Sequence, residues 1–170
     1  MLPPVSSIAT TVLVMGVIAA AAIDLRSRRI PNELTAAMTG IGFGLGASAQ
    51  GEVSMLASLA GFTLGLMFMM PGYVMGATGA GDLKLMGAIG ALVGPSMVLT
   101  AFLCTALAGG VLALIVAVQR QRLTQTVAAT GRLIAAPASA PREIQDAHAA
   151  SRFAYGPAIA VGSLVAVLIA

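Results

Sequence analysis

Charged side chains are scarce in this sequence: Asp, Glu, Lys and Arg together make up 9% of its 170 residues. A soluble domain needs roughly 25% charged residues to cover its surface. The hydrophobic share is 58%, and the mean hydropathy is +0.97. The composition therefore predicts a protein embedded in a membrane rather than a soluble domain.

Cysteine, histidine and tryptophan are also almost missing. Cys104 is the only cysteine, His148 is the only histidine, and there is no tryptophan. A single cysteine excludes a disulfide framework and a zinc site built from several thiolates. His148 stands alone in a predicted loop, so a His-ligated metal is not expected either. We therefore expect neither a metal nor another cofactor.

Long apolar stretches dominate what is present, and they match the roughly 20 residues that a helix needs to cross a bilayer. We place six such segments, and they are Val5–Ile23, Leu34–Gln50, Val53–Met70, Leu83–Val93, Ser96–Val118 and Phe153–Ala170. The sequence thus predicts an all-α polytopic membrane protein with six transmembrane helices, which form a single domain over residues 1–170.

The nine basic residues all fall on one side of this arrangement. They are Arg26, Arg28, Arg29, Lys84, Arg120, Arg122, Arg132, Arg142 and Arg152. Basic loops remain in the cytoplasm, so both termini are predicted to be periplasmic in a bacterial inner membrane. This distribution accounts for the net charge of +3 without a nucleic-acid partner.

Residues 119–152 form the one long connection, which the basic residues place in the cytoplasm. Leu123, Val127 and Ile134 recur there at helical spacing, whereas the polar residues point elsewhere. This pattern predicts an amphipathic helix that lies on the membrane surface.

Two acidic residues, Asp24 and Asp82, lie at the cytoplasmic ends of predicted spans. Carboxylates in membrane segments are costly and therefore indicate function. A pair at one depth could activate water, with one carboxylate accepting a proton and the other donating one. Two structural interpretations remain open: Asp82 could cap a helix, and Asp24 could pair with Arg28 one turn later.

Three stretches of sequence carry further motifs. Residues 24–32 read Asp-Leu-Arg-Ser-Arg-Arg-Ile-Pro-Asn, residues 79–82 read Gly-Ala-Gly-Asp and precede Lys84, and residues 155–162 read Tyr-Gly-Pro-Ala-Ile-Ala-Val-Gly. In this order and at these membrane positions, they resemble the type IV prepilin (leader) peptidases, which are intramembrane aspartic peptidases with a GxGD motif. The GxGD motif alone is a weak signal, but the three stretches together are specific.

The resemblance implies that Asp24 and Asp82 are catalytic, with Gly79, Gly81, Lys84, Pro31 and Asn32 as supporting motif residues. It implies removal of the basic leader from prepilins, whose N-terminal helix is hydrophobic, at the cytoplasmic face. The short first loop has no Cys-x-x-Cys motifs, so the chain resembles the small branch of Flp-type (tight-adherence) pili. N-methylation of the product is not expected.

The supporting residues also have structural interpretations. Gly79 and Gly81 are expected to adopt backbone conformations closed to other residues and to let a substrate strand approach. Pro31 and Asn32 are expected to start the second helix. Two other functions remain as alternatives: a small ion-coupled transporter or channel, and a non-catalytic subunit of a pilus or secretion assembly.

Overall fold

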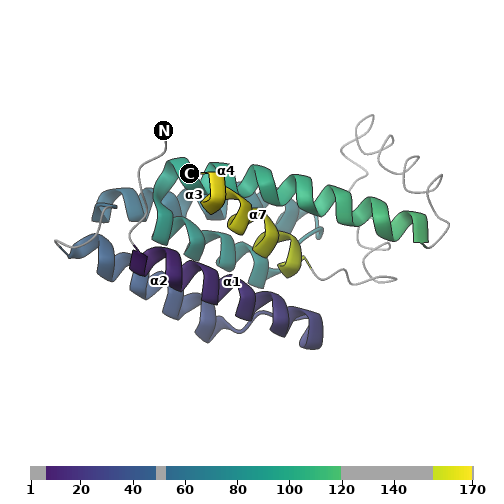
Figure 1. Cartoon of the computed structure of the whole chain (residues 1–170), viewed down its shortest axis with the longest axis horizontal. Helices are drawn as coiled ribbons and strands as arrows, with labels where there is room; N and C mark the ends of the chain where they lie inside the picture. The colour runs from purple at the N-terminus through teal and green to yellow at the C-terminus, as the bar shows by residue number, and fades with distance from the viewer. Residues whose placement is uncertain (1–6, 49–52, 120–154, 170) are drawn as a thin grey trace.

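The computed structural model describes residues 7–48, 53–119 and 155–169 of the chain (Figure 1). Its helices are α1 (Ser7–Ser27), α2 (Asn32–Ala47), α3 (Met55–Val74), α4 (Ala80–Gln119) and α7 (Gly156–Ile169). The described ranges contain no strand, which confirms the all-α class. The predicted amphipathic helix of the long loop lies outside the described residues.

Helix α4 consists of two arms that meet at Gly94. This glycine has φ 78° and ψ −178°, a conformation that a residue with a side chain rarely adopts. Met86 of the first arm lies against Gly65 of α3, while Phe102 of the second arm stacks on Phe68 with ring centroids 5.1 Å apart. Both arms thus run beside the same part of α3, so the chain turns back between them (Figure 1), at Gly94. The predicted break between the fourth and fifth segments is confirmed.

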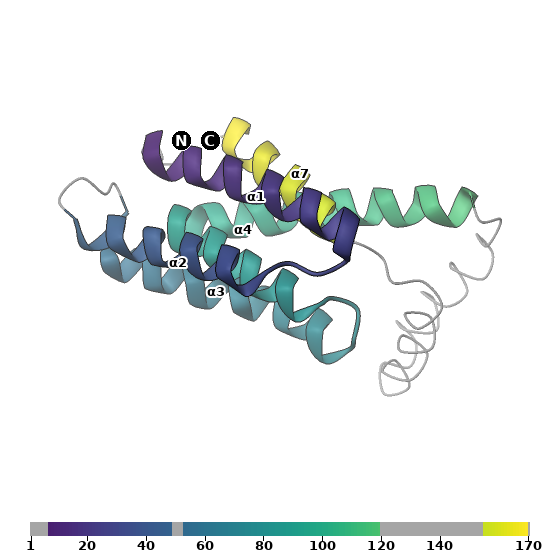
Figure 2. The ribbon, with the colours of Figure 1, turned by 90° about the horizontal axis from the view of Figure 1, so that it is seen from below.

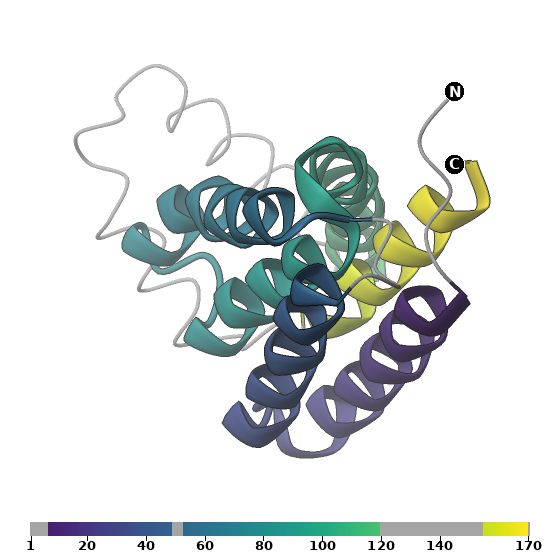
Figure 3. The ribbon, with the colours of Figure 1, turned by 90° about the vertical axis from the view of Figure 1, so that its left-hand side faces the viewer.

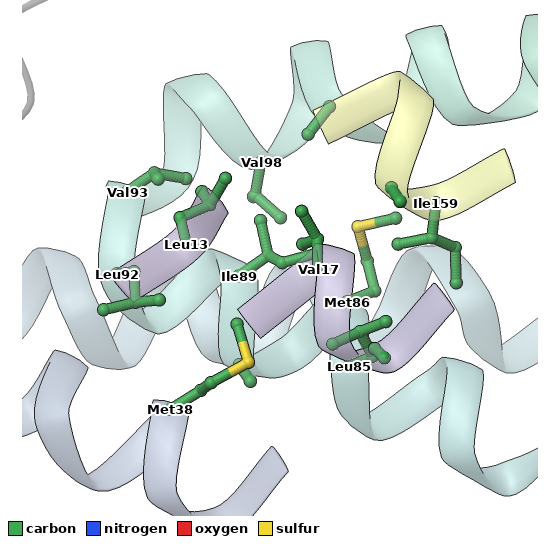
Figure 4. Close-up of a cluster of buried hydrophobic side chains, with 14 of the residues drawn as sticks. Leu13, Val17, Met38, Leu85, Met86, Ile89, Leu92, Val93, Val98 and Ile159 are labelled. Atoms are coloured by element: carbon green, nitrogen blue, oxygen red, sulfur yellow. The ribbon is translucent and has the colours of Figure 1, made fainter. Parts of the chain in front are cut away.

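The first arm of α4 lies at the centre of the bundle. Every residue from 85 to 94 is buried. Around Ile89 gather side chains of α1, α2 and α7, among them Val17, Met38 and Ile159 (Figure 4). Viewed from the end, α2 and α3 lie on one side of this arm and α1 and α7 on the other (Figure 3). Asp82 therefore lies at the start of the arm whose residues 85–94 are all buried.

Small residues bring α3 and the first arm of α4 into backbone contact. A Cβ placed on Gly61 would lie 2.8 Å from the carbonyl carbon of Gly94, and closer still to the Gly90 carbonyl oxygen. The buried Ser58 hydroxyl donates a hydrogen bond to the Ala91 carbonyl. Close packing of small residues and hydrogen bonds between helices stabilise bundles in lipid, where burying apolar surface contributes little.

Within the described residues, three helical segments are long and apolar enough to cross a membrane: Ile8–Ser27, Met55–Val74 and Ala80–Ile115. Large apolar side chains also cover the outside of the bundle, for example Met15, Leu56, Leu107 and Leu168, which are all more than half exposed. An apolar exterior of this kind suits lipid rather than water. The chain is accordingly a membrane protein, whereas six spans and periplasmic termini remain predictions.

Several predicted boundaries are wrong in a way that matters for the candidate site. The first span is predicted to end at Ile23, but α1 continues to Ser27, so Asp24 is a helical residue. The third is predicted to end at Met70, but α3 continues through Pro71 to Val74, because a proline near a helix end removes only one backbone hydrogen bond. The fourth begins at Ala80 instead of Leu83, which brings Asp82 into the first turn of α4.

Candidate active site

The end of α1 lies beside the start of α7 (Figure 2), and Asp24 makes the contact between them. Asp24 lies in the last two turns of α1, and only 6% of its surface is exposed. Its Oδ2 atom accepts a hydrogen bond from the backbone N–H of Gly156, at 2.9 Å. Gly156 is the first residue of α7. The first N–H groups of a helix have no partner within it and attract anions, so the start of α7 binds the Asp24 carboxyl group.

This contact needs a glycine at position 156. A Cβ placed on Gly156 would lie 2.7 Å from Asp24 Oδ2 and 2.9 Å from Asp24 Cβ. Any side chain there would push α7 away from the carboxyl group. In the sequence, residues 155–162 carry only part of the family resemblance, and nothing there predicts the contact between Gly156 and Asp24.

Asp82 is held in a similar way at the start of α4. It is 8% exposed, and its Oδ2 atom accepts a hydrogen bond from the backbone N–H of Gly79, at 2.9 Å. Gly79 immediately precedes the helix, and its carbonyl oxygen accepts the Leu83 N–H at 3.2 Å. An acidic side chain in the third helical position that binds the cap residue is half of a capping box. Asp82 thus does stabilise the helix start, although from the third position rather than as the N-cap itself.

The two aspartates are the only charged side chains that are buried in the described part of the chain. They lie close enough for the charge of Asp24 to act on Asp82. Tyr155, next to Gly156, also lies within electrostatic reach of Asp82. The fold therefore brings the end of α1, the start of α4 and the start of α7 to one place.

The alternative pairing of Asp24 with Arg28 is not what the structure shows. Arg28 is exposed, and it contacts Asp24 through its backbone, whose N–H donates to the Asp24 carbonyl oxygen at 2.8 Å. Its φ of 52° ends α1 in the left-handed region, where glycine is the usual residue. In the described part of the chain, hydrogen bonds reach only the Oδ2 atom of each carboxyl group. The Oδ1 atoms are left for water or a substrate.

The expected backbone conformation of the motif glycines is wrong. Neither Gly79 nor Gly81 has a positive φ, whereas Gly76 in the preceding turn has φ 75°. Gly81 is needed for a different reason: a Cβ there would lie 3.0 Å from the Cβ of the buried Ile30. The close approach at Gly81 is made by the α1–α2 connection of the protein itself.

Two further motif residues join α2 to α4. The Lys84 ammonium group donates a hydrogen bond to Asn32 Oδ1, at 2.8 Å. Asn32 is the first residue of α2, and Pro31 stands at its N-cap, as predicted for the start of the second helix. Together with Ile30, this bond ties the connection after Asp24 to the helix that carries Asp82.

Metal ligands do not assemble here. Within residues 7–48, 53–119 and 155–169, no three His, Cys, Asp or Glu side chains come close enough to hold a metal ion. The buried polar groups of this site are two carboxyl groups, and their chemistry is that of proton transfer.

Comparison with protein families adds independent evidence. The model of the type IV leader peptidase family matches residues 11–114. The matched region contains Asp24, Asp82 and the motif residues beside them, but not residues 155–162. No curated protein and no solved structure was found to match the chain.

Proposed function

The chain belongs to the type IV leader peptidase family, and on that premise we propose that it is a membrane-embedded aspartic endopeptidase with Asp24 and Asp82 as its catalytic pair. The observation that carries the proposal is the burial of these two carboxyl groups within electrostatic reach of each other. Burying a charge without an opposite charge costs free energy, and such an arrangement is typical of sites that move protons.

In the proposed reaction, one carboxylate accepts a proton from a water molecule, and the water oxygen attacks the scissile carbonyl carbon. The other aspartate, which is protonated, donates its proton to the carbonyl oxygen. Collapse of the tetrahedral intermediate breaks the C–N bond: the leaving amine takes the proton that the first carboxylate accepted from water, and a hydroxyl group of the intermediate returns a proton to the second aspartate. The Gly79 and Gly156 amides fix the Oδ2 atoms, which leaves the Oδ1 atoms to exchange protons with water and substrate.

The substrate that we propose is a prepilin whose hydrophobic N-terminal helix lies in the membrane and whose basic leader is cut off at the cytoplasmic face of the inner membrane. The bundle has an apolar exterior, which is consistent with a substrate helix that reaches the site from the lipid. The short α1–α2 connection, residues 28–31, leaves no room for a Cys-rich domain there, which supports the Flp-type branch without methyltransferase activity.

The test is cleavage of a prepilin-like peptide by the purified protein in detergent. Asp24→Asn and Asp82→Asn each keep the shape of the side chain and its ability to accept the backbone N–H. Because general acid–base groups contribute about 10²–10⁴-fold, each variant should lose at least that much turnover. Either variant that kept about a tenth of wild-type turnover would contradict the assignment.

Glu33→Gln provides the matched control, since Glu33 is an exposed acid in the first turn of α2. It removes the same charge near the same end of the bundle and should leave turnover unchanged. A wild-type protein that binds the peptide without cutting it would favour an assembly subunit over a peptidase.

A further inference from the structure

The Gly156 amide can hold Asp24 only if the start of α7 is itself fixed. The carbonyl oxygen of Tyr155 accepts the Ala158 and Ile159 N–H groups at 3.0 and 3.2 Å, so Tyr155 is the residue that starts the hydrogen bonding of α7. Its side chain is half-buried and packs against the core. Where this side chain lies therefore determines where the adjoining amide points.

The Tyr155 ring lies in a notch on the second arm of α4. A Cβ placed on Gly109 would lie 2.7 Å from the Tyr155 hydroxyl oxygen and 2.9 and 3.0 Å from ring atoms Cε2 and Cζ. The notch exists only because residue 109 has no side chain. On the neighbouring residue, Gly110, an added Cβ would meet nothing within 4 Å.

A second contact fixes the direction of α7 along the same arm. Gly162 packs against the backbone of Thr105, which lies one turn before Gly109. Helix α7 and the second arm therefore run antiparallel, and α7 lies between that arm and α1 (Figure 3). The second arm of α4 therefore affects the Asp24 carboxyl group indirectly, through the position of α7.

We propose that Tyr155 is a positioning residue: its ring, seated in the Gly109 notch, holds the start of α7 so that the Gly156 amide binds Asp24 Oδ2. This inference rests on the proposed function for its effect on turnover, but not for its effect on the Asp24 carboxyl group. Tyr155 acts through Gly156 and has no direct part in the reaction.

The experiment compares two substitutions of adjacent glycines, Gly109→Val and Gly110→Val. Valine at position 109 fills the notch and expels the ring, whereas valine at position 110 points into open space. A misplacement of about 1 Å in an active site can cost about 100-fold, so Gly109→Val should lower kcat by about 10- to 100-fold with KM unchanged. Gly110→Val should match the wild type. Equal kcat values for the two variants would overturn the proposal.

A spectroscopic measurement separates positioning from loss of folding and from failure of the proposed function. The infrared bands of Asp24 are identified by subtraction of the Asp24→Asn spectrum. They should shift in Gly109→Val, which loses the amide hydrogen bond, and stay in place in Gly110→Val. This result needs no peptidase activity. Unshifted Asp24 bands in Gly109→Val would overturn the proposal even if turnover fell.

Two substitutions of Tyr155 cover the case in which Gly109→Val does not fold. Tyr155→Phe keeps the ring in the notch and should keep kcat close to that of the wild type. Tyr155→Ala removes the ring and should lower kcat by about 10- to 100-fold. If Tyr155→Phe lost as much as Tyr155→Ala, the hydroxyl group itself would be required, and the proposed role of the ring would be wrong.

Discussion

Gly65→Ala should disturb the position of Asp82 without touching it. Gly65 is buried in α3, and a Cβ placed on it would lie 2.8 Å from the Met86 carbonyl carbon and 3.0 Å from Gly87 Cα. Carbon atoms pack at about 3.5–4.0 Å. Both neighbours are backbone atoms, so no change of rotamer can relieve the contact. The first arm of α4 must therefore move by roughly 0.5–1 Å, one turn away from Asp82.

The size of the effect follows from this displacement. Adding a methyl group to a packed interior costs about 1–3 kcal/mol, and replacing glycine by alanine in a helix offsets this by up to about 1 kcal/mol. The net loss of stability should be about 0–2 kcal/mol. A shift of nearly 1 Å can cost about 100-fold in rate, so kcat should fall by about 10- to 100-fold. The loss of activity should thus exceed what the loss of stability explains.

Gly44→Ala is the matched control, because Gly44 is exposed in α2 and an added Cβ would meet nothing within 4 Å. Thermal unfolding in detergent measures stability, and cleavage of a prepilin-like peptide measures kcat. Gly44→Ala should match the wild type in both assays. If Gly65→Ala did so too, the backbone contact between α3 and α4 would not position Asp82, and the reasoning would be refuted.

Three further outcomes are expected. In a Cys104→Ser background, a cysteine at position 54 (Ser54→Cys) should react with a membrane-impermeant thiol reagent only from the periplasm. A cysteine at position 139 (Ser139→Cys) should react only from the cytoplasm. Labelling of each from the opposite side would show that the predicted orientation is inverted. Pilin matured by this enzyme alone should show a free N-terminal amine by mass spectrometry, and an added methyl group would contradict the assignment to the small branch. Lys84→Met and Asn32→Ala should each lower the free energy of unfolding by about 0.5–1.5 kcal/mol, the net value of one hydrogen bond. The double variant should be no less stable than either single variant, because both lose the same bond. Additive losses would show that the two side chains act separately.

The helical class and the general position of both aspartates could be predicted from the sequence because their signals are local. Apolar runs of bilayer length, and basic residues on one side of them, are visible in single segments. The fourth and fifth apolar segments could likewise be separated in the sequence, on either side of Gly94 and Pro95. Asp24 and Asp82 followed from the same reasoning, since each is an acid at the edge of an apolar run.

The contacts of the glycines could not be predicted, because they depend on which helices meet. Gly156 lies far from Asp24 in sequence, and nothing near either residue indicates that α7 packs against the end of α1. Gly81 was expected to supply a special backbone conformation, yet it makes room for Ile30. A glycine in a sequence indicates that a side chain would be harmful, but only the packed structure shows which neighbour requires its absence.

The two carboxyl groups are held by the same device in different settings. Each Oδ2 atom accepts one backbone N–H at the start of a helix, from Gly79 before α4 and from Gly156 in α7. For Asp82 that helix is its own, so the bond is local and would form wherever the motif is helical. For Asp24 the helix is α7, which lies outside the matched region, residues 11–114. The region that identifies the family therefore contains both carboxyl groups but only one of the two amides that orient them, and the arrangement at Asp24 depends on how α7 packs against α1 and α4.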